Sequence, residues 1–239
     1  MNINFSGRIV LVAGGTGGLG NAVSLAFLEE GAKVVVTYRK EEAFAALKKA
    51  AGAKAVALEG SLADVTDERA TATLVASIVA QHSRLDALVN TVGGYAGGVA
   101  LWDLETKVFD MMLSLNLRSG YALARAALPA MLKQRHGSIV NVAAKAALDH
   151  GAGAVAYAAS KAAAVALMDS LAADVKGTGV RVNSILPSII DTEPNRQAMP
   201  KADFTKWPKA EQIARVILFL CSDDAEVVHG AAVPVYGNS

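Results

Sequence analysis

Short, nearly continuous runs of Val, Ile, Leu and Ala alternate with longer segments in which apolar residues recur every three or four positions. The short runs are typical of strands buried on both faces, and the longer segments are typical of helices with one apolar face. We expect strands at residues 8–14, 33–38, 53–60, 85–93, 137–143, 180–187 and 231–237. We expect helices at residues 18–30, 41–51, 67–82, within 105–134, at 154–176 and at 209–221.

This alternation predicts an α/β protein with a doubly wound, Rossmann-like parallel sheet that is covered by helices on both faces. No linker or internal repeat divides residues 1–239, so we expect a single domain. One stretch, residues 188–208, lacks a clear period. Such a stretch inside a compact domain is typical of a lid or binding loop, and we expect it to be the substrate loop.

Composition narrows the functional classes. The chain is 53% hydrophobic and 19% charged, with a net charge of +1, which gives no reason to expect a nucleic acid or an anionic membrane as partner. The lone Cys221 cannot form an internal disulfide and is typical of a small core residue. The four histidines have no ligand spacing, so we expect no metal site. With neither a leader pattern nor a charge-free apolar run, we expect a cytoplasmic protein.

A glycine-rich turn, "AGGTGGLG" at residues 13–20, directly follows the first expected strand and opens the first helix. Gly14, Gly18 and Gly20 allow a tight turn and a close approach of the backbone to a pyrophosphate at the helix N-terminus. Thr16 and Leu19 lie in the same turn, and we expect them to contact the cofactor as well. The alternative is a tight turn that binds no ligand.

The end of the second expected strand bears on the choice of cofactor. An acidic residue there binds the ribose 2′-hydroxyl, whereas Arg favours a 2′-phosphate. This chain has Tyr38 and Arg39 at that point, followed by Lys40. We therefore favour NADPH, with NADH possible; the alternative is that Arg39 and Lys40 form an ordinary solvated helix start.

Tyr157 and Lys161 are four residues apart in "YAASK", so a helix places them on one face. A free phenol has a pKa near about 10, and a neighbouring ammonium group stabilises its phenolate. The pair is therefore a candidate for proton transfer, with Tyr157 as proton donor during a reduction. The alternative is an unremarkable pair on the surface of an amphipathic helix.

Together these motifs resemble the short-chain dehydrogenase/reductase family over essentially the whole chain. Further matches are "DVTD" from Asp64, "LVNTVGG" with Asn90 and Gly93, Asn116, and "ILPSIIDT". The resemblance implies that Asp64 contacts adenine and that Asn116 holds a water that relays protons to Lys161. It also implies cofactor contacts from Asn90, Gly93, Pro187, Ile189, Ile190 and Thr192. This chain departs from the family pattern at Ala13, Thr91, Val92 and Ser188.

The largest departure is Ala144, which stands where the family's catalytic Ser falls. Dihydropteridine reductases, which are similar to this family, also carry Ala there. The stretches 93–98, 144–149 and 186–207 resemble theirs, the last being long and idiosyncratic. The animal enzymes differ because they resemble NADH users with an acidic second-strand end and lack a counterpart to Asn116.

A hydroxyl at position 144 would bind a substrate oxygen, and such a donor to an oxyanion contributes about 2.7–4 kcal/mol. A quinonoid dihydropterin needs this donor less, because it is already electrophilic and its reduction builds no full alkoxide. We therefore expect a reductase of a flat conjugated or quinonoid acceptor. An alternative is that Lys145 points into the site in place of the missing hydroxyl. A lysine at a strand end is, however, more often solvated.

Aromatic and sulfur side chains are candidate walls of the substrate pocket beside Ala144: Tyr95, Met199, Phe204 and Trp207. The alternative is that Met199, Phe204 and Trp207 pack the 188–208 loop onto the body of the protein and that Tyr95 is structural. Ala-rich faces within 105–134 and 154–176 resemble the family's dimer and tetramer interfaces, or allow close helix–sheet packing. Two other functions stay open: a carbonyl or 3-oxoacyl reductase with a substitute for the missing Ser, and a non-catalytic NADP(H)-binding protein.

Overall fold

The computed structural model describes residues 3–239 and contains a seven-stranded sheet, in the order β3-β2-β1-β4-β5-β6-β7, in which every pair is parallel. The strands are β1 (Ile9–Ala13), β2 (Lys33–Tyr38), β3 (Leu58–Leu62), β4 (Ala87–Asn90), β5 (Gly137–Val142), β6 (Val180–Pro187) and β7 (Ala232–Val235). The helices are α1 (Gly18–Glu29), α2 (Glu41–Ala51), α3 (Glu68–His82), α4 (Thr106–Leu113), α5 (Ser119–Gln134), α6 (Val155–Asp174), α7 (Glu193–Ala198) and α8 (Ala210–Cys221).

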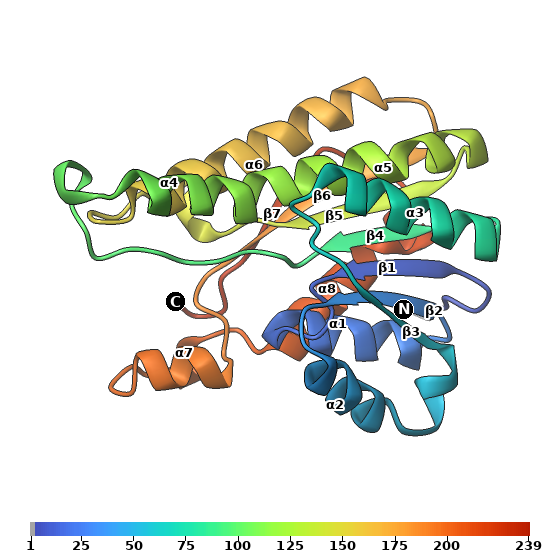
Figure 1. The fold of residues 1–239 in the computed structure, drawn as a ribbon, viewed down its shortest axis with the longest axis horizontal. Coiled ribbons are helices and arrows are strands. Elements are labelled where there is room, and N and C mark those ends of the chain that lie inside the picture. The colour runs from blue at the N-terminus through green and yellow to red at the C-terminus, as the bar shows by residue number, and fades with distance from the viewer. Residues whose placement is uncertain (1–2) are drawn as a thin grey trace.

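Helices cover both faces of this sheet (Figure 1): α1, α2 and α8 lie on one side, and α3, α4, α5 and α6 on the other. Two separate apolar clusters fill the two layers, and alternate residues of each central strand contribute to one or the other. In β1, for example, Val10 and Val12 face the α1–α8 layer, whereas Leu11 faces the α3–α5 layer. The predicted doubly wound, Rossmann-like fold is confirmed.

The third strand begins later than the sequence pattern predicts. Residues 53–60 were expected to form it, but Gly52–Ala57 form a 3₁₀ turn and β3 spans Leu58–Leu62. The physical reason is exposure: Val56 is 92% exposed, whereas Leu58 is buried and pairs with Val34 of β2. The apolar residues of "AKAVA" alternate with a lysine but are exposed or only partly buried, so this segment does not form a strand.

The long helix expected within 105–134 is present, but its hydrogen bonding changes in the middle. Helix α4 runs into a π-helical turn at Ser114–Arg118, and α5 continues from Ser119. Such turns insert one extra residue into a helix and recur at functional sites. Here the inserted turn contains Asn116, which is buried.

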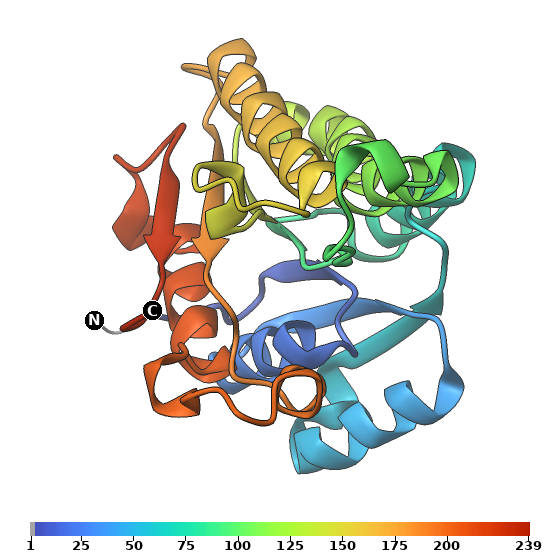
Figure 2. The same ribbon diagram turned by 90° about the vertical axis from the view of Figure 1, so that its left-hand side faces the viewer.

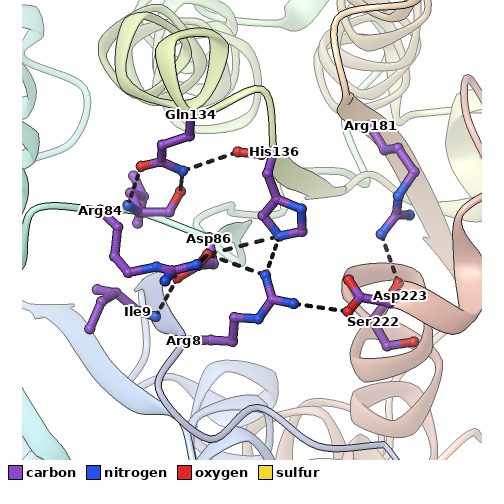
Figure 3. A network of polar contacts seen from close by, with 10 residues as sticks. Arg8, Ile9, Arg84, Asp86, Gln134, His136, Arg181, Ser222 and Asp223 are labelled. Atoms are coloured by element: carbon purple, nitrogen blue, oxygen red, sulfur yellow. Dashed lines mark hydrogen bonds and ion pairs between the residues drawn. The ribbon is translucent and has the colours of Figure 1, made fainter.

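A polar network ties the sheet together at the amino ends of its strands (Figure 3). The buried Asp86 carboxylate accepts hydrogen bonds from the backbone N–H of Ile9 at 2.8 Å and from Arg84 at 2.6 and 2.8 Å. Arg8 donates to Asp223 at 2.8 Å and contacts His136. The network joins the starts of β1, β4 and β5 to the segment after α8, at the edge opposite the carboxyl ends of the strands.

Helix α6 is long and apolar enough, by length and composition alone, to cross a membrane, with a mean hydropathy of 1.2 over 18 residues. This is weak support for a membrane span, because core helices pass the same test. In this structure α6 packs on β6 and α4, and its high hydropathy follows from its many alanines.

Candidate active site

The expected nucleotide residues gather at the carboxyl ends of the central strands, where α1 begins. In Figure 2 the loops after β4 (green) and β5 (yellow) and the segment that contains α7 (orange) lie around these strand ends. Open doubly wound sheets bind their ligands at this edge. The expected site residues therefore come from segments far apart in the sequence but close in space.

The glycine-rich turn is packed so tightly that a Cβ at several of its glycines would collide with neighbouring atoms. Gly14 has a φ of +74°, and its N–H donates to Thr37 Oγ1 at 2.8 Å. A Cβ at Gly20 would collide with the carbonyl oxygen of Gly14, and one at Gly18 would lie 2.9 Å from Thr192 Cγ2. Helix α1 has no side-chain cap and no acidic residue in its first turn. Its first amide groups therefore meet no carboxylate from their own helix, which suits an anion.

Beyond this turn, the strand-end residues Tyr38 and Arg39 differ in their surroundings. The ring of Tyr38 stacks on Phe44 with centroids 4.8 Å apart, and the neighbouring Glu41 raises the pKa of Tyr38. The side chain of Arg39 is exposed. Asp64 lies close enough to feel that charge: hydrogen bonds from Thr66 lower the pKa of Asp64, and Arg39 lowers it further. Arg39 thus presents an exposed guanidinium group beside the expected adenine contact.

At the end of β4 a set of hydrogen bonds joins the strand to its neighbours. Asn90 Nδ2 donates to Asn141 Oδ1 at 2.9 Å, and Thr91 Oγ1 donates to the carbonyl of Ala13 at 2.7 Å. A Cβ at Gly93 would lie 2.9 Å from Asn116 Oδ1 and 3.1 Å from Lys161 Nζ. Gly93 thus lies directly against the side chains of Asn116 and Lys161.

Asn116 holds the loop that follows this strand. Its Oδ1 accepts from the N–H of Gly94 at 2.9 Å, and its Nδ2 donates to the carbonyl of Gly94 at 3.1 Å. The same Nδ2 lies 2.9 Å from Ser160 Oγ on α6. The side-chain amide is therefore fully engaged with protein groups. Sequence reasoning missed Ser160, although its place just before Lys161 was a usable signal.

Tyr157 and Lys161 lie on one face of α6, as their spacing predicts. Burial shifts their pKa values in opposite directions. Lys161 is buried, its Nζ donates to the carbonyl of Val142 at 2.9 Å, and burial lowers its pKa to about 8. Burial and, to a smaller extent, Tyr95 raise the pKa of Tyr157 to about 12. In the protein without cofactor, Tyr157 is therefore a neutral phenol at physiological pH.

Ala144 is 6% exposed and extended, with φ −167° and ψ 160°, and it lies two residues after the end of β5. Lys145, the alternative group, is partly exposed. Its Nζ lies 3.8 Å from Asp149 Oδ2 and 5.3 Å from the ring centroid of Tyr236. In this structure Lys145 therefore interacts with Asp149 and Tyr236.

The 188–208 segment is more regular than the sequence predicts. It contains α7 and a 3₁₀ turn at Phe204–Lys206; the start of α7 was signalled by Pro194, since Pro favours the first turn of a helix. Asp191 accepts two hydrogen bonds from Arg196, at 2.6 and 2.9 Å, which brace this turn. Ser188, the departure from the family's Gly, donates to the carbonyl of Tyr236 at 2.7 Å.

Of the four expected walls of the substrate pocket, only Tyr95 lies against Tyr157, with ring centroids 4.9 Å apart. Trp207 is buried and packs on Phe204, also at 4.9 Å between centroids, and Arg196 lies over the Phe204 ring. Trp207 is thus buried, as expected of a packing residue, whereas the ring of Phe204 packs within the segment itself. Met199, at the end of α7, is partly buried. Ile189 and Ile190, which were expected to contact the cofactor, lie near the start of the 188–208 segment. Ile189 is 41% exposed.

Residues 8–203 match the family model described as short chain dehydrogenase. The chain belongs to that family. It is 30% identical to the 3-oxoacyl-[acyl-carrier-protein] reductase FabG of Thermotoga maritima, with 98% of each chain covered. Two solved structures are similar at 26% identity. ElxO with NADP bound has a TM-score of 0.91 and coverage of 96% and 97%; NAD⁺-bound xylitol dehydrogenase has a TM-score of 0.90 and coverage of 98% and 99%.

Membership of the short-chain dehydrogenase family makes this chain an oxidoreductase and confirms the broader of the two resemblances seen in the sequence. The narrower resemblance, to dihydropteridine reductases, is not established by these relatives, which include a 3-oxoacyl reductase.

Proposed function

We propose that this protein is an NADPH-dependent reductase that acts on a flat conjugated or quinonoid acceptor of the dihydropterin type. The observation that carries the proposal is the pairing of an intact Tyr157 and Lys161 with a buried Ala144 and no hydroxyl on that residue. A donor to a developing oxyanion is worth about 2.7–4 kcal/mol, so its loss is costly for a ketone. An acceptor that is already electrophilic tolerates the loss.

The residues present fit a dinucleotide. The exclusion of side chains at Gly18 and Gly20 leaves backbone at the start of α1, where a pyrophosphate is held by N–H groups. The exposed guanidinium of Arg39 suits a 2′-phosphate, and no carboxylate ends β2. Asp64, Asn90 and Thr192 would border the remaining parts of the cofactor. When bound, the nicotinamide supplies the hydride.

The chain's own residues manage the proton. Tyr157, a neutral phenol near pH 7, donates its proton to the acceptor, and Lys161 stabilises the phenolate that forms. Asn116 keeps the loop after β4 in place through Gly94 and so fixes the space beside Lys161. The substrate is thus a small molecule, and the 188–208 segment is the part that would close over it.

The alternative of a 3-oxoacyl reductase is favoured by one observation, the 30% identity to FabG across nearly the whole chain. The two are separated by NADPH oxidation with quinonoid dihydropterin, with a small quinone and with a 3-oxoacyl thioester. We expect turnover of the first two and little of the thioester. Turnover of the thioester alone would overturn the proposal, and tight NADPH binding without any turnover would favour a non-catalytic binding protein.

A further inference from the structure

Tyr95 is a large aromatic side chain, 70% exposed, that nevertheless contacts the expected proton donor. Its ring meets that of Tyr157 edge to face, with centroids 4.9 Å apart and planes at 75°. This arrangement is the preferred one for two aromatic rings and is worth about 0.5–1.5 kcal/mol beyond burial. Most of the Tyr95 side chain faces solvent, and its ring packs against the ring of Tyr157.

The loop that contains Tyr95 is built to hold the ring there. On one side, Asn116 clamps both the N–H and the carbonyl of Gly94. On the other side, the N–H of Gly98 donates to the carbonyl of Gly153 at 2.9 Å, two residues before α6 begins. A Cβ at Gly97 would collide with the Tyr95 hydroxyl, so a larger residue there would push the ring out of this position. Tyr95 and Tyr157 are thus fixed to a common frame.

The geometry points to Tyr95 as a positioning residue that covers the ring of Tyr157, restricts its contact with water and keeps it protonated until an acceptor arrives. This inference rests on the proposed role of Tyr157 as proton donor. Covering a phenol disfavours its charged form, and a second phenolate beside it is disfavoured further by repulsion. Burial and Tyr95 are also the two causes that raise the pKa of Tyr157 to about 12.

Other charged groups do not take this role. Lys161, one helical turn away, would favour the phenolate rather than the phenol. The remaining charged groups on the elements packed against α6 are exposed or hydrogen-bonded elsewhere: Lys107, Asp110, Arg118, Lys145 and Arg181.

The test is the ionisation of Tyr157 in the protein alone, followed by NMR of ¹³Cζ-labelled tyrosine between pH 8 and about 11, within reach of the pKa of about 12. Five tyrosines give five resonances, and Tyr157→Phe assigns the relevant one. In the unsubstituted protein that resonance remains mostly that of a neutral phenol, with about a tenth of Tyr157 ionised at pH 11. In Tyr95→Ala we expect the ionised fraction of Tyr157 at about pH 11 to be several-fold larger, because its ring is uncovered.

Tyr95→Phe keeps the covering ring and removes only the second hydroxyl, so we expect a smaller change than in Tyr95→Ala. Tyr121→Phe, on α5, is the matched control and leaves the Tyr157 titration unchanged. An unchanged Tyr157 titration in Tyr95→Ala, with native backbone chemical shifts, overturns the inference. Because no acceptor is used, failure to reduce a quinonoid substrate leaves this result standing on its own.

Discussion

Lys161 is a buried cation, so its removal is expected to make the protein more stable while destroying its activity. Its side chain is 5% exposed, and no carboxylate lies within ion-pair distance of its Nζ among residues 3–239. Burial lowers its pKa from 10.5 to about 8. At 1.36 kcal/mol per pH unit, the charged form therefore costs about 3 kcal/mol in the folded protein at pH 7.

The sign of the pH dependence follows from this lowered pKa. Below pH 8 the lysine is charged in both states, and the folded state bears the full cost. As pH rises from 8 towards 10.5, the folded state loses its proton first and the wild-type protein gains stability. Lys161→Met has no such gain. Its advantage is therefore largest at pH 7 and shrinks as pH increases through this window.

The hydrogen bond from Nζ to the carbonyl of Val142 is lost in Lys161→Met, which offsets about 1 kcal/mol or more of the gain. We expect a net stabilisation of about 1–2 kcal/mol at pH 7, or a rise in Tm of roughly 2–8 °C for a protein of this size. Calorimetry of the cofactor-free protein at pH 7, 8 and 9.5 measures it. Lys176→Met, at an exposed site, is the control and shows no pH-dependent difference.

A lower Tm for Lys161→Met at pH 7, with the same difference at pH 9.5, would refute the reasoning. It would mean that the ammonium group is solvated or paired in the folded protein, and the low pKa of Lys161 would lose its basis in burial.

Three further outcomes are expected. Arg39→Asp shifts the ratio of kcat/KM for NADPH and NADH by tenfold or more towards NADH, since a carboxylate repels the 2′-phosphate; an unchanged ratio removes the cofactor argument. Tyr157→Phe lowers kcat sharply, by about 10²–10⁴-fold if proton donation limits the rate, and by less for an activated acceptor than for a ketone. Asp86→Ala lowers the free energy of unfolding in urea by about 2–3 kcal/mol, because it strips Arg84 and the N–H of Ile9 of their acceptor, while kcat is unaffected.

Much of the fold was predictable because buried strands and amphipathic helices leave strong periodic signals. The start of β3 was not, since Val56 is apolar yet faces solvent at the edge of the sheet. Helix α7 was missed because six residues with no buried member leave no hydrophobic period; only Pro194 marked its start. The hydrophobic pattern thus predicted the helices and strands whose apolar residues are buried. It failed where apolar residues face solvent or where an element has no buried residue.

For the site, the spacing of Tyr157 and Lys161 predicted their shared helix face. Neither spacing nor composition indicated the clamp between Asn116 and Gly94, because that contact depends on the π-helical turn. The burial of Trp207 likewise depends on how the 188–208 segment folds back. The functional roles of these residues, the preference for NADPH and a dimer or tetramer remain predictions; light scattering of the purified protein measures the last.

The central claim is that the absence of a hydroxyl at position 144 suits an acceptor that does not need one. Ala144→Ser tests it through kcat/KM for quinonoid dihydropterin and for a 3-oxoacyl thioester, each with NADPH. We predict a kcat/KM for the thioester that rises by about tenfold or more, in line with the value of an oxyanion donor, and a value for the dihydropterin that stays within about threefold. An equal change for both acceptors, or a wild-type protein that already reduces only the thioester, would contradict the account.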